Sequence, residues 1–290
     1  MFLPPDPSYE IGSIHQGVEV TAFQFNNHAI PFALTRPAEE TAVSNYVILY
    51  SHGNAEDLGQ LLDLFVQFRE SLGVCIASYD YIGYGPSKLE GADPQEELCF
   101  SVANAAFDHL VNECGFAPER VILYGRSLGT GPTTWLAARL STSQSSFAGM
   151  ILQSPLTSAI GVVSEFLTHI ARDMFQNHKR ISRVRRPILI VHGDQDNVVP
   201  FAHGQRLSRI VEELDNDIQH VPHASSSAEA DFPICRRLFR FVPIEGAGHN
   251  DIEINHWYTL SQSVRDFIDH IRGSNVVLLP AMPKTFPSCL

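Results

Sequence analysis

The chain of 290 residues is poor in basic residues and has no long apolar run. Lys and Arg number 20 against 32 Asp and Glu, and the formal net charge of -12 argues against a surface that binds nucleic acid. No segment approaches the roughly 18 to 20 apolar residues that a membrane span needs, and the start "MFLPPDPSYE" lacks the basic and apolar regions of a signal peptide. We therefore expect a cytoplasmic protein that is not secreted and that does not bind nucleic acid.

Cysteines are few and scattered, without a CxxC pair or the Cys/His spacing of a zinc site. This pattern indicates free thiols in a reducing compartment. The glycine-containing stretches lack the Lys-Ser/Thr of a P-loop and the GxGxxG of a dinucleotide site. We expect no metal, no nucleotide and no other cofactor. The five cysteines are Cys75, Cys99, Cys114, Cys235 and Cys289.

Short apolar runs alternate along the chain with segments of helical length and period, which predicts an α/β fold. From residue 46 onward, runs such as "YVILYS", "RVILYG" and "PILIVHG" are continuous rather than alternating. Such runs are typical of strands buried on both faces of a parallel sheet. Residues 9 to about 36 alternate better, and we expect them to form an antiparallel edge of a doubly wound sheet.

The length suits one large α/β domain, which we place at residues 1–273. The stretch "DNDIQHVPHASSSAEADFPICRR" is of low complexity and lies where roughly 2 to 6 residues would normally connect a helix to a strand. We interpret residues about 215–238 as a surface insertion. Residues 274–290, which contain three prolines, are expected to form an extended or disordered tail.

The stretch "YGRSLGTG" contains a serine that could be a nucleophile, Ser127. It follows the apolar run "RVILYG" and precedes a helical segment, and Gly125 and Gly129 stand where a side chain would collide in a tight strand-to-helix turn. This is the context of a nucleophile elbow. The same turn would place the backbone N–H of Leu128 at a helix N-terminus, where a developing oxyanion is favoured.

A serine hydroxyl needs a base, and His249 in "EGAGHND" is the best candidate because it stands in a glycine-rich loop after the last predicted strand. Asp196 in "VHGDQDNVVP" follows the preceding strand and is the preferred acid, with Asp194 as its rival. Each residue alone has a structural interpretation, such as a turn or a cap. Their order along the chain and their placement after different predicted strands favour a catalytic triad.

The turn after "YVILYS" is expected to supply the second oxyanion donor, because its strand would lie beside the nucleophile strand. We assign the donor N–H to Asn54, with Ala55 as the alternative. His52 is interpreted as a residue that fixes this loop rather than as a second base.

Six stretches together resemble the α/β-hydrolase-domain proteins of subfamily seventeen, serine hydrolases that remove palmitate from cysteines of membrane-associated proteins. They are "SHGNAEDLGQ", "SYDYIGYGPS", "PERVILYGRSLGT", "QSPLTS", "PILIVHGDQDNVVPFAHG" and "EGAGHNDIE", and the likeness covers residues from about 3 to 270. The resemblance implies an α/β-hydrolase fold. Because no long cap domain is inserted after "QSPLTS", we expect a short lid only. The resemblance also places Ser127, Asp196 and His249 on the nucleophile, acid and base.

The sequence departs from the family pattern in three places. The family usually carries a cysteine-rich, palmitoylated stretch before the "FLPP" segment, with which the present sequence starts. The residue before the nucleophile is usually Gln and is here Arg126, which we expect to support the site by adding charge near it or to point away from it. The insertion at about 215–238 is not part of the pattern, and it precedes the strand that delivers His249.

The segment after "QSPLTS" carries apolar residues at helical spacing, which fits either a helix facing the core or a short lid over an acyl groove. The favoured substrate is an S-acylated protein, reached by peripheral contact with a membrane. The alternatives are a lysophospholipase, a general esterase or a serine peptidase with the same triad, and a non-catalytic binding module that keeps the fold. The apolar residues are Ile160, Val163, Phe166, Leu167, Ile170 and Met174.

Overall fold

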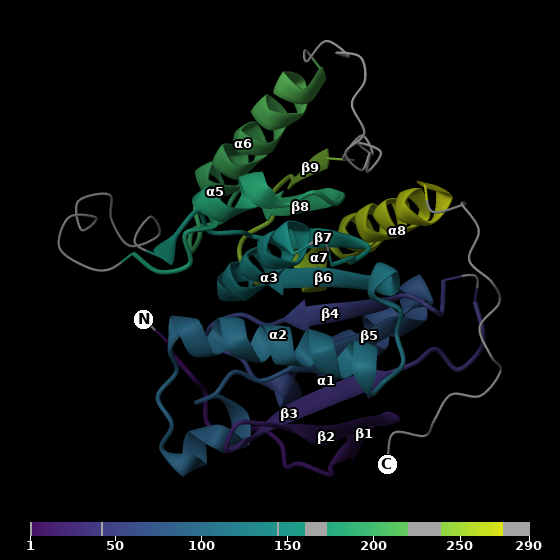
Figure 1. Ribbon diagram of the computed structural model, residues 1–290, viewed down its shortest axis with the longest axis vertical. Helices are drawn as coiled ribbons and strands as arrows, with labels where there is room; N and C mark the ends of the chain where they lie inside the picture. The colour runs from purple at the N-terminus through teal and green to yellow at the C-terminus, as the bar shows by residue number, and fades with distance from the viewer. Residues whose placement is uncertain (1, 42, 144, 160–172, 220–238, 275–290) are drawn as a thin grey trace.

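The computed structural model describes residues 2–41, 43–143, 145–159, 173–219 and 239–274 (Figure 1). Within this part of the chain, nine strands form one sheet. In chain order the strands are β1 (Ile14–His15), β2 (Val18–Phe25), β3 (His28–Thr35), β4 (Val47–Ser51), β5 (Cys75–Tyr79), β6 (Val121–Arg126), β7 (Gly149–Gln153), β8 (Ile188–Gly193) and β9 (Phe239–Ile244).

The sheet is mostly parallel, in the order β1-β2-β3-β5-β4-β6-β7-β8-β9. The six strands in the order β5-β4-β6-β7-β8-β9 are all parallel to one another. The strands β1, β2 and β3 form an antiparallel edge that joins β5. The predicted α/β class is therefore confirmed, and the antiparallel edge falls where the alternating pattern of the sequence placed it.

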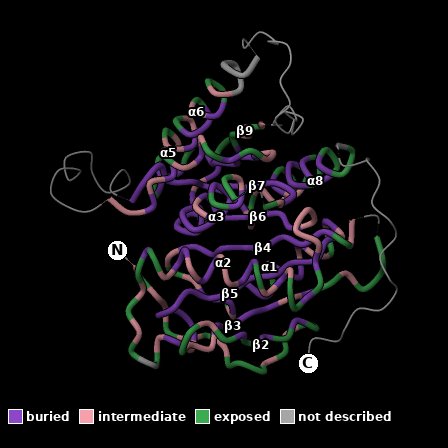
Figure 2. The backbone as a smooth tube through the Cα atoms, in the orientation of Figure 1, coloured by how far each residue is buried: buried purple, intermediate pink, exposed green. Residues whose placement is uncertain are grey.

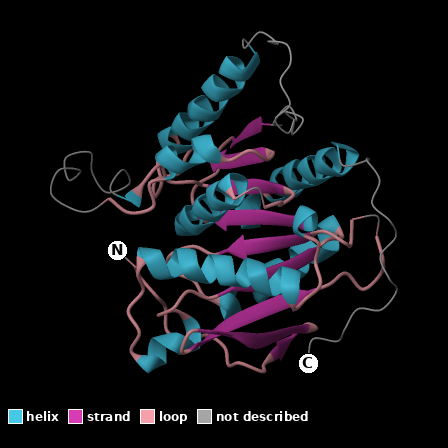
Figure 3. Cartoon of the chain, viewed as in Figure 1, coloured by secondary structure: helices cyan, strands magenta, loops and turns pink. Residues whose placement is uncertain are grey.

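Helices cover both faces of the sheet (Figures 1 and 3). On one face lie α1 (Leu58–Leu72) and α8 (Trp257–Ser274), whose apolar residues share one core with the strands. On the other face lie α2 (Glu96–Asn112), α3 (Thr130–Thr142) and α6 (Ala202–Gln219). Short elements complete the fold: η1 (Gly85–Glu90), η2 (Pro118–Arg120), η3 (Ser127–Gly129), α5 (Asn177–Arg180), η5 (Ile181–Arg183) and α7 (Ile252–Asn255).

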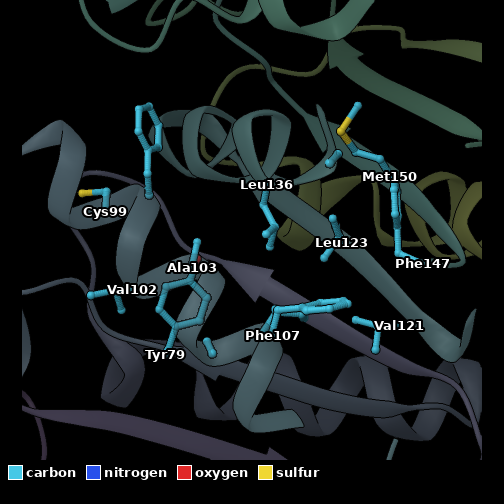
Figure 4. Close-up of a cluster of buried hydrophobic side chains, with 14 of the residues drawn as sticks. Tyr79, Cys99, Val102, Ala103, Phe107, Val121, Leu123, Leu136, Phe147 and Met150 are labelled. Atoms are coloured by element: carbon cyan, nitrogen blue, oxygen red, sulfur yellow. The ribbon is translucent and has the colours of Figure 1, made fainter. Parts of the chain in front are cut away.

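Each central strand feeds both hydrophobic cores because its side chains alternate between the two faces. In β4, Ile48 and Tyr50 pack with α1, whereas Val47 and Leu49 face the core of α2 and α3. All residues of β4, β5 and β7 are buried, which explains their continuous apolar runs (Figure 2). Figure 4 shows part of the second core, where Phe107 of α2 and Leu136 of α3 lie over the strands.

Helix α1 is capped at both ends by residues adjacent to it in the sequence. The side chain of Asp57 accepts a hydrogen bond from the N–H of Gln60 at the N-terminus. At the C-terminus, Gly73 adopts a φ of 70°, the left-handed conformation that favours glycine. This helix follows β4 directly, so its capping fixes the turn that was predicted to supply an oxyanion donor.

Some of the sequence predictions fall on other parts of the chain. Of the apolar residues assigned to a lid or core helix, those from 160 to 170 lie outside the described residues, and Met174 is half-buried against the α2 core. Residues 220–238 of the expected insertion and residues 275–290 of the expected tail also lie outside them. Residues 215–219 are the last turn of α6, and residue 274 ends α8.

Candidate active site

Ser127 sits on a sharp turn between β6 and α3. Strand β6 ends at Arg126, a short 3-10 turn spans Ser127–Gly129, and α3 begins at Thr130. The backbone of Ser127 has a φ of 52°, which a residue other than glycine seldom adopts. This is the geometry of a nucleophile elbow, and it leaves Ser127 9% exposed at the end of the strand.

The two glycines that flank Ser127 are required by close contacts. A Cβ atom on Gly125 would lie 2.6 Å from the carbonyl oxygen of Gly129. A Cβ atom on Gly129 would lie 2.0 Å from the carbonyl oxygen of Ser51 and 2.6 Å from that of His52. The elbow therefore packs directly on the end of the neighbouring strand β4, so the turn after β4 lies beside the serine.

The structure brings Ser127, His249 and Asp196 together in one hydrogen-bonded chain. Nε2 of His249 lies 2.9 Å from Oγ of Ser127, and Nδ1 of His249 lies 2.7 Å from Oδ2 of Asp196. Because an ionised carboxylate can only accept, Nδ1 carries the proton, and Nε2 is left to accept the hydrogen of the serine hydroxyl. The arrangement fits a nucleophile, its base and the acid that orients the base.

Asp196 is held by donors on both carboxylate oxygens. The N–H groups of Val198 and Val199 donate to Oδ1 at 2.9 and 2.8 Å, and His249 donates to Oδ2. Burial alone would raise the pKa of this carboxyl, but hydrogen bonds from His192 and His249 outweigh burial and hold the pKa well below its usual range. Asp196 is thus ionised at neutral pH.

The rival acid, Asp194, has a different place. Its Oδ1 accepts the N–H of Gly246 at 2.8 Å, and its own N–H donates to the carbonyl of Ile244. Asp194 therefore ties the loop after β8 to the loop that carries His249. The geometry places Asp196, and not Asp194, against the imidazole.

The turn after β4 closes on itself through Glu56, whose Oε1 accepts the N–H of Gly53 at 2.5 Å. This contact occupies the amide of Gly53, so the prediction of Asn54, with Ala55 as its alternative, remains for the oxyanion donor. The side chain of Asn54 is bonded to other residues, because its Oδ1 accepts hydrogen bonds from the N–H of Leu3 and from the hydroxyl of Tyr84. The other predicted donor, the N–H of Leu128, belongs to a buried residue in the elbow.

His52 lies fully buried beneath this turn. Its Nδ1 donates to the carbonyl of Gly53 at 2.8 Å, and its Nε2 lies 3.3 Å from Oδ1 of Asp80. Burial would lower the pKa of His52, but Asp80 outweighs burial and raises it. The side chain is in contact with the turn, at the place where the sequence suggested a supporting residue.

Residues 2–9 run across the outside of the same turn, and side chains of the turn, α1 and η1 hold them. The hydroxyl of Tyr9 donates to Oδ2 of the buried Asp80 at 2.5 Å. The N–H and hydroxyl of Ser8 both donate to Asp57, the residue that caps α1. Nζ of Lys88 donates to the carbonyls of Pro4 and Pro5 and to Asp6. The N-terminal segment is therefore fastened to the turn after β4 and to the residues around it.

The guanidinium of Arg126 forms ion pairs with two carboxylates, Glu56 and Glu253. The sequence raised Arg126 as a supporting residue but did not reveal either partner. Its partners are 70 and 127 residues away in the sequence. Each stands near a predicted site residue, two positions after Asn54 and four after His249, and this nearness was the only available signal.

Within the described residues, no group of three or more His, Cys, Asp and Glu side chains is arranged to hold a metal ion. None of the helices in that part of the chain is long and apolar enough to cross a bilayer. The histidine on α6, His203, pairs with the N–H and hydroxyl of Thr157 at 3.1 and 2.9 Å and lies outside the hydrogen-bonded chain of Ser127.

The fold is shared with solved esterase structures. The apo form of Thermogutta terrifontis esterase 2 superposes with a TM-score of 0.60 at 16% identity, over 94% of this chain and 100% of that one. Est1E from Butyrivibrio proteoclasticus superposes with a TM-score of 0.58 at 16% identity, over 88% and 99%. At such low identity the likeness shows the α/β-hydrolase fold alone. No family model matches the chain.

Curated relatives match the sequence over most of its length. The chain is 33% identical over 278 residues to α/β hydrolase domain-containing protein 17B of Homo sapiens, covering 89% of this chain and 85% of that protein. It is 34% identical over 228 residues to α/β hydrolase domain-containing protein 17C of Mus musculus, covering 78% and 61%. The resemblance seen in the sequence is confirmed. The chain belongs to the family of α/β hydrolase domain-containing proteins 17B and 17C and is a serine hydrolase.

Proposed function

We propose that the protein removes long-chain acyl groups, palmitate above all, from S-acylated cysteines of membrane-associated proteins. The observation that carries the proposal is the hydrogen-bonded chain from Ser127 through His249 to Asp196. It stands at the carboxyl ends of parallel strands, where α/β folds place their reactive groups.

The reaction begins at the serine hydroxyl. As Oγ of Ser127 attacks the thioester carbonyl carbon, Nε2 of His249 takes its proton across the 2.9 Å contact. The carbonyl oxygen becomes an oxyanion, which we assign to the backbone N–H groups of Leu128 and Asn54. Asp196 keeps the imidazole in the required orientation and stabilises the imidazolium through its 2.7 Å contact with Nδ1.

Collapse of the tetrahedral intermediate breaks the carbon–sulfur bond and leaves the acyl group on Ser127. The sulfur departs as a thiolate and then takes the proton from His249, which returns the imidazole to its neutral form. In the second half of the reaction, His249 takes a proton from water, which attacks the acyl-enzyme and releases the fatty acid. Ser127 regains its proton from the imidazolium.

The choice of thioesters over amides follows from the leaving group. A cysteine thiolate with a pKa of about 8.5 can leave without a proton, whereas an amine must be protonated before it departs. The esterase fold neighbours, one of them phosphorylated by paraoxon, support ester-type chemistry on this fold. We expect the protein to act in the cytoplasm at the periphery of membranes, where S-acylated proteins are displayed.

The experiment that tests the proposal combines labelling with a matched substrate series. Wild type and Ser127→Ala are treated with a fluorophosphonate probe, and labelling is expected only in wild type. Peptides of one sequence then carry palmitate as a thioester on Cys, an ester on Ser or an amide on Lys. Turnover should be fastest for the thioester and slowest for the amide.

Each contrary outcome identifies a different alternative. Labelling that survives in Ser127→Ala would overturn the assignment of the nucleophile. Preference for the ester or for a lysophospholipid would make the protein an esterase or a lysophospholipase, and turnover of an unmodified peptide would make it a peptidase. A folded wild type that is inert to the probe would be a binding module that keeps the fold.

A further inference from the structure

The guanidinium of Arg126 joins two loops of the active site. Arg126 is the last residue of β6, directly before Ser127, and its side chain is 12% exposed. Strand β6 lies beside β4 in the sheet (Figure 1). Glu56, on the turn after β4, contacts the guanidinium from one side. The loop after β9, which carries His249, reaches it from another side.

On the side of β4, the guanidinium is bonded to the turn that holds the predicted oxyanion donor. Nη1 of Arg126 donates to Oε2 of Glu56 at 3.0 Å, and the other oxygen of Glu56 accepts the N–H of Gly53. A Cβ atom on Gly53 would lie 2.8 Å from Oε1 of Glu56 and 3.1 Å from Nη1 of Arg126. The backbone of the turn is therefore packed directly against this ion pair.

On the side of β9, the same guanidinium is bonded to the loop of the base. Nη2 of Arg126 donates to the carbonyl of His249 at 3.4 Å and to Oδ1 of Asn250 at 3.1 Å. Nε donates to Oε1 of Glu253 at 2.8 Å, and the amide of Gln153 on β7 donates to that same oxygen at 2.7 Å. The base loop and helix α7 are thus fastened to the two strands beneath them.

One positive charge balances two carboxylates in this cluster. Glu56 and Glu253 have side chains only 15% and 12% exposed, so each needs a partner to offset the loss of water. Burial would lower the pKa of Arg126, but the two carboxylates outweigh burial and hold it above its ordinary value. The guanidinium is charged at every pH at which the enzyme works. A neutral side chain at position 126 would leave two negative charges uncompensated beside the base loop.

We propose that Arg126 is a positioning residue, whose guanidinium fixes the turn after β4 and the loop of His249 relative to the nucleophile. The proposal rests on the proposed function of Ser127, His249 and the β4 turn. Arg126 does not contact the reacting atoms in this assignment. It aligns the oxyanion donor and the base at the same time, and a misplacement of about 1 Å in such groups can cost on the order of 100-fold in rate.

The proposal also predicts the pH dependence, through the charges that surround His249. Without the cation of Arg126, the two uncompensated carboxylates favour the protonated imidazole, so more alkaline conditions are needed to free the base. The charged groups packed around the base and its loop come from five elements. They are Asp194, Asp196 and His192 on β8 and its loop, Asp251 on the base loop, Glu253 on α7, Glu56 on the β4 turn and Arg126 on β6.

The test measures kcat, KM and pH profiles with S-octanoyl N-acetylcysteamine as substrate. Arg126→Gln is expected to lower kcat about 10- to 100-fold while KM changes less than about 3-fold, because the substrate binds without touching the guanidinium. Arg126→Lys keeps the charge and should recover part of kcat. In Arg126→Gln the acid limb of kcat/KM should move to higher pH, and adding Glu253→Gln should move it back.

A matched control removes an arginine of a surface ion pair. Nη1 of Arg240 lies 3.1 Å from Oδ2 of Asp266, with both side chains nearly half exposed. Arg240→Gln should leave kcat and the pH profile unchanged. If Arg126→Gln, folded as judged by its thermal unfolding, also has the kcat and acid limb of wild type, the proposal is overturned.

Two further variants keep the test decisive if Arg126→Gln does not fold. Glu56→Gln weakens only the tie to the β4 turn, and Glu253→Gln weakens only the tie to α7. Each should lower kcat and shift the acid limb to lower pH, because one negative charge has gone and the cation stays. Wild-type kcat and pH profiles in both folded variants would overturn the proposal.

Failure of the proposed function gives a different result. If Ser127→Ala still reacts with the fluorophosphonate probe, the site itself is wrongly assigned. If Ser127→Ala is inert and Arg126→Gln behaves as wild type, only the role of Arg126 is refuted.

Discussion

Nε2 of His192 lies 3.3 Å from Oδ2 of Asp196, the same oxygen that faces Nδ1 of His249. The acid of the site is therefore held between two imidazoles, one from the preceding strand β8 and one from the loop after β9. Nε2 of His192 also donates to the carbonyl of Val199 at 2.8 Å, which fixes the ring in place. This arrangement makes Asp196 important for stability as well as for catalysis.

Asp196→Asn should destabilise the protein in a pH-dependent way. The pKa of Asp196 is held below its usual range in the folded state. Its carboxylate therefore adds stability above the unfolded pKa of about 3.9, and that stability is lost as pH falls through the lower folded pKa. In urea unfolding, the deficit of the variant should be about 2 kcal/mol at pH 5 and should shrink toward pH 3.

The same substitution made in a His192→Gln background is the control for this prediction. Because one donor to the carboxylate has been removed, the deficit at pH 5 should be smaller there than in wild type. A deficit that is independent of pH between 5 and 3 would mean that Asp196 is not stabilised by its ionised form.

Substitutions of Asp194 and Asp196 should have very different effects on kcat. Asp196→Asn is expected to lower kcat by about 1,000- to 10,000-fold, because the amide favours the wrong tautomer of His249. Asp194→Asn removes only the negative charge, because the amide oxygen can still accept the N–H of Gly246, and should cost less than about 10-fold in kcat. Steady-state kinetics on an acyl thioester gives both values, and the reverse order would transfer the role of acid to Asp194.

Gly129→Ala should destabilise the protein because its Cβ would meet backbone atoms of the strand end at Ser51 and His52. Backbone cannot rotate away as a side chain can, so we expect a loss of about 3 kcal/mol in the free energy of unfolding. Gly273→Ala is the control, since nothing lies within 4 Å of a Cβ at that position of α8. That change should be neutral or stabilising by up to about 1 kcal/mol.

Tyr9→Phe should loosen the N-terminal segment from the site. The variant deprives the fully buried Asp80 of a hydrogen bond, at an expected cost of about 2 kcal/mol in urea unfolding. Tyr258 is 79% exposed, and Tyr258→Phe should stay within about 0.5 kcal/mol of wild type. Equal stability of the two variants would show that the segment adds nothing to the fold.

Much of the fold could be predicted because buried parallel strands have continuous apolar sequences. The run "VILY" of residues 121–124 lies within β6, and "ILIVHG" of residues 188–193 is β8. The boundaries of the individual strands β1, β2 and β3 at the N-terminal edge could not be predicted in the same way. Strand β3 contains Pro31, whose carbonyl accepts the N–H of Asp80, although proline is normally a sign against an inner strand.

The reactive residues were predictable because chemistry restricts both their type and their place at strand ends. The contacts that hold them were not predictable, because they join residues far apart in sequence and follow no period. The pairing of Glu56 and Glu253 with Arg126 depends on the placement of β4 beside β6 and on the position of α7, which only the tertiary structure shows. Positioning contacts of this kind require the tertiary structure.

The location of the base on the loop after β9 has a consequence for how the enzyme loses activity. Strand β9 is the last strand of the described sheet, and only Ile244 among its residues is fully buried. Edge segments with little burial open locally at a lower free energy than the core does. Gentle heating or low denaturant should therefore release His249 while Ser127, on the central strand β6, is still in place. Inactivation would precede global unfolding, and hydrogen exchange would be faster in β9 than in the central strands β4, β6 and β7.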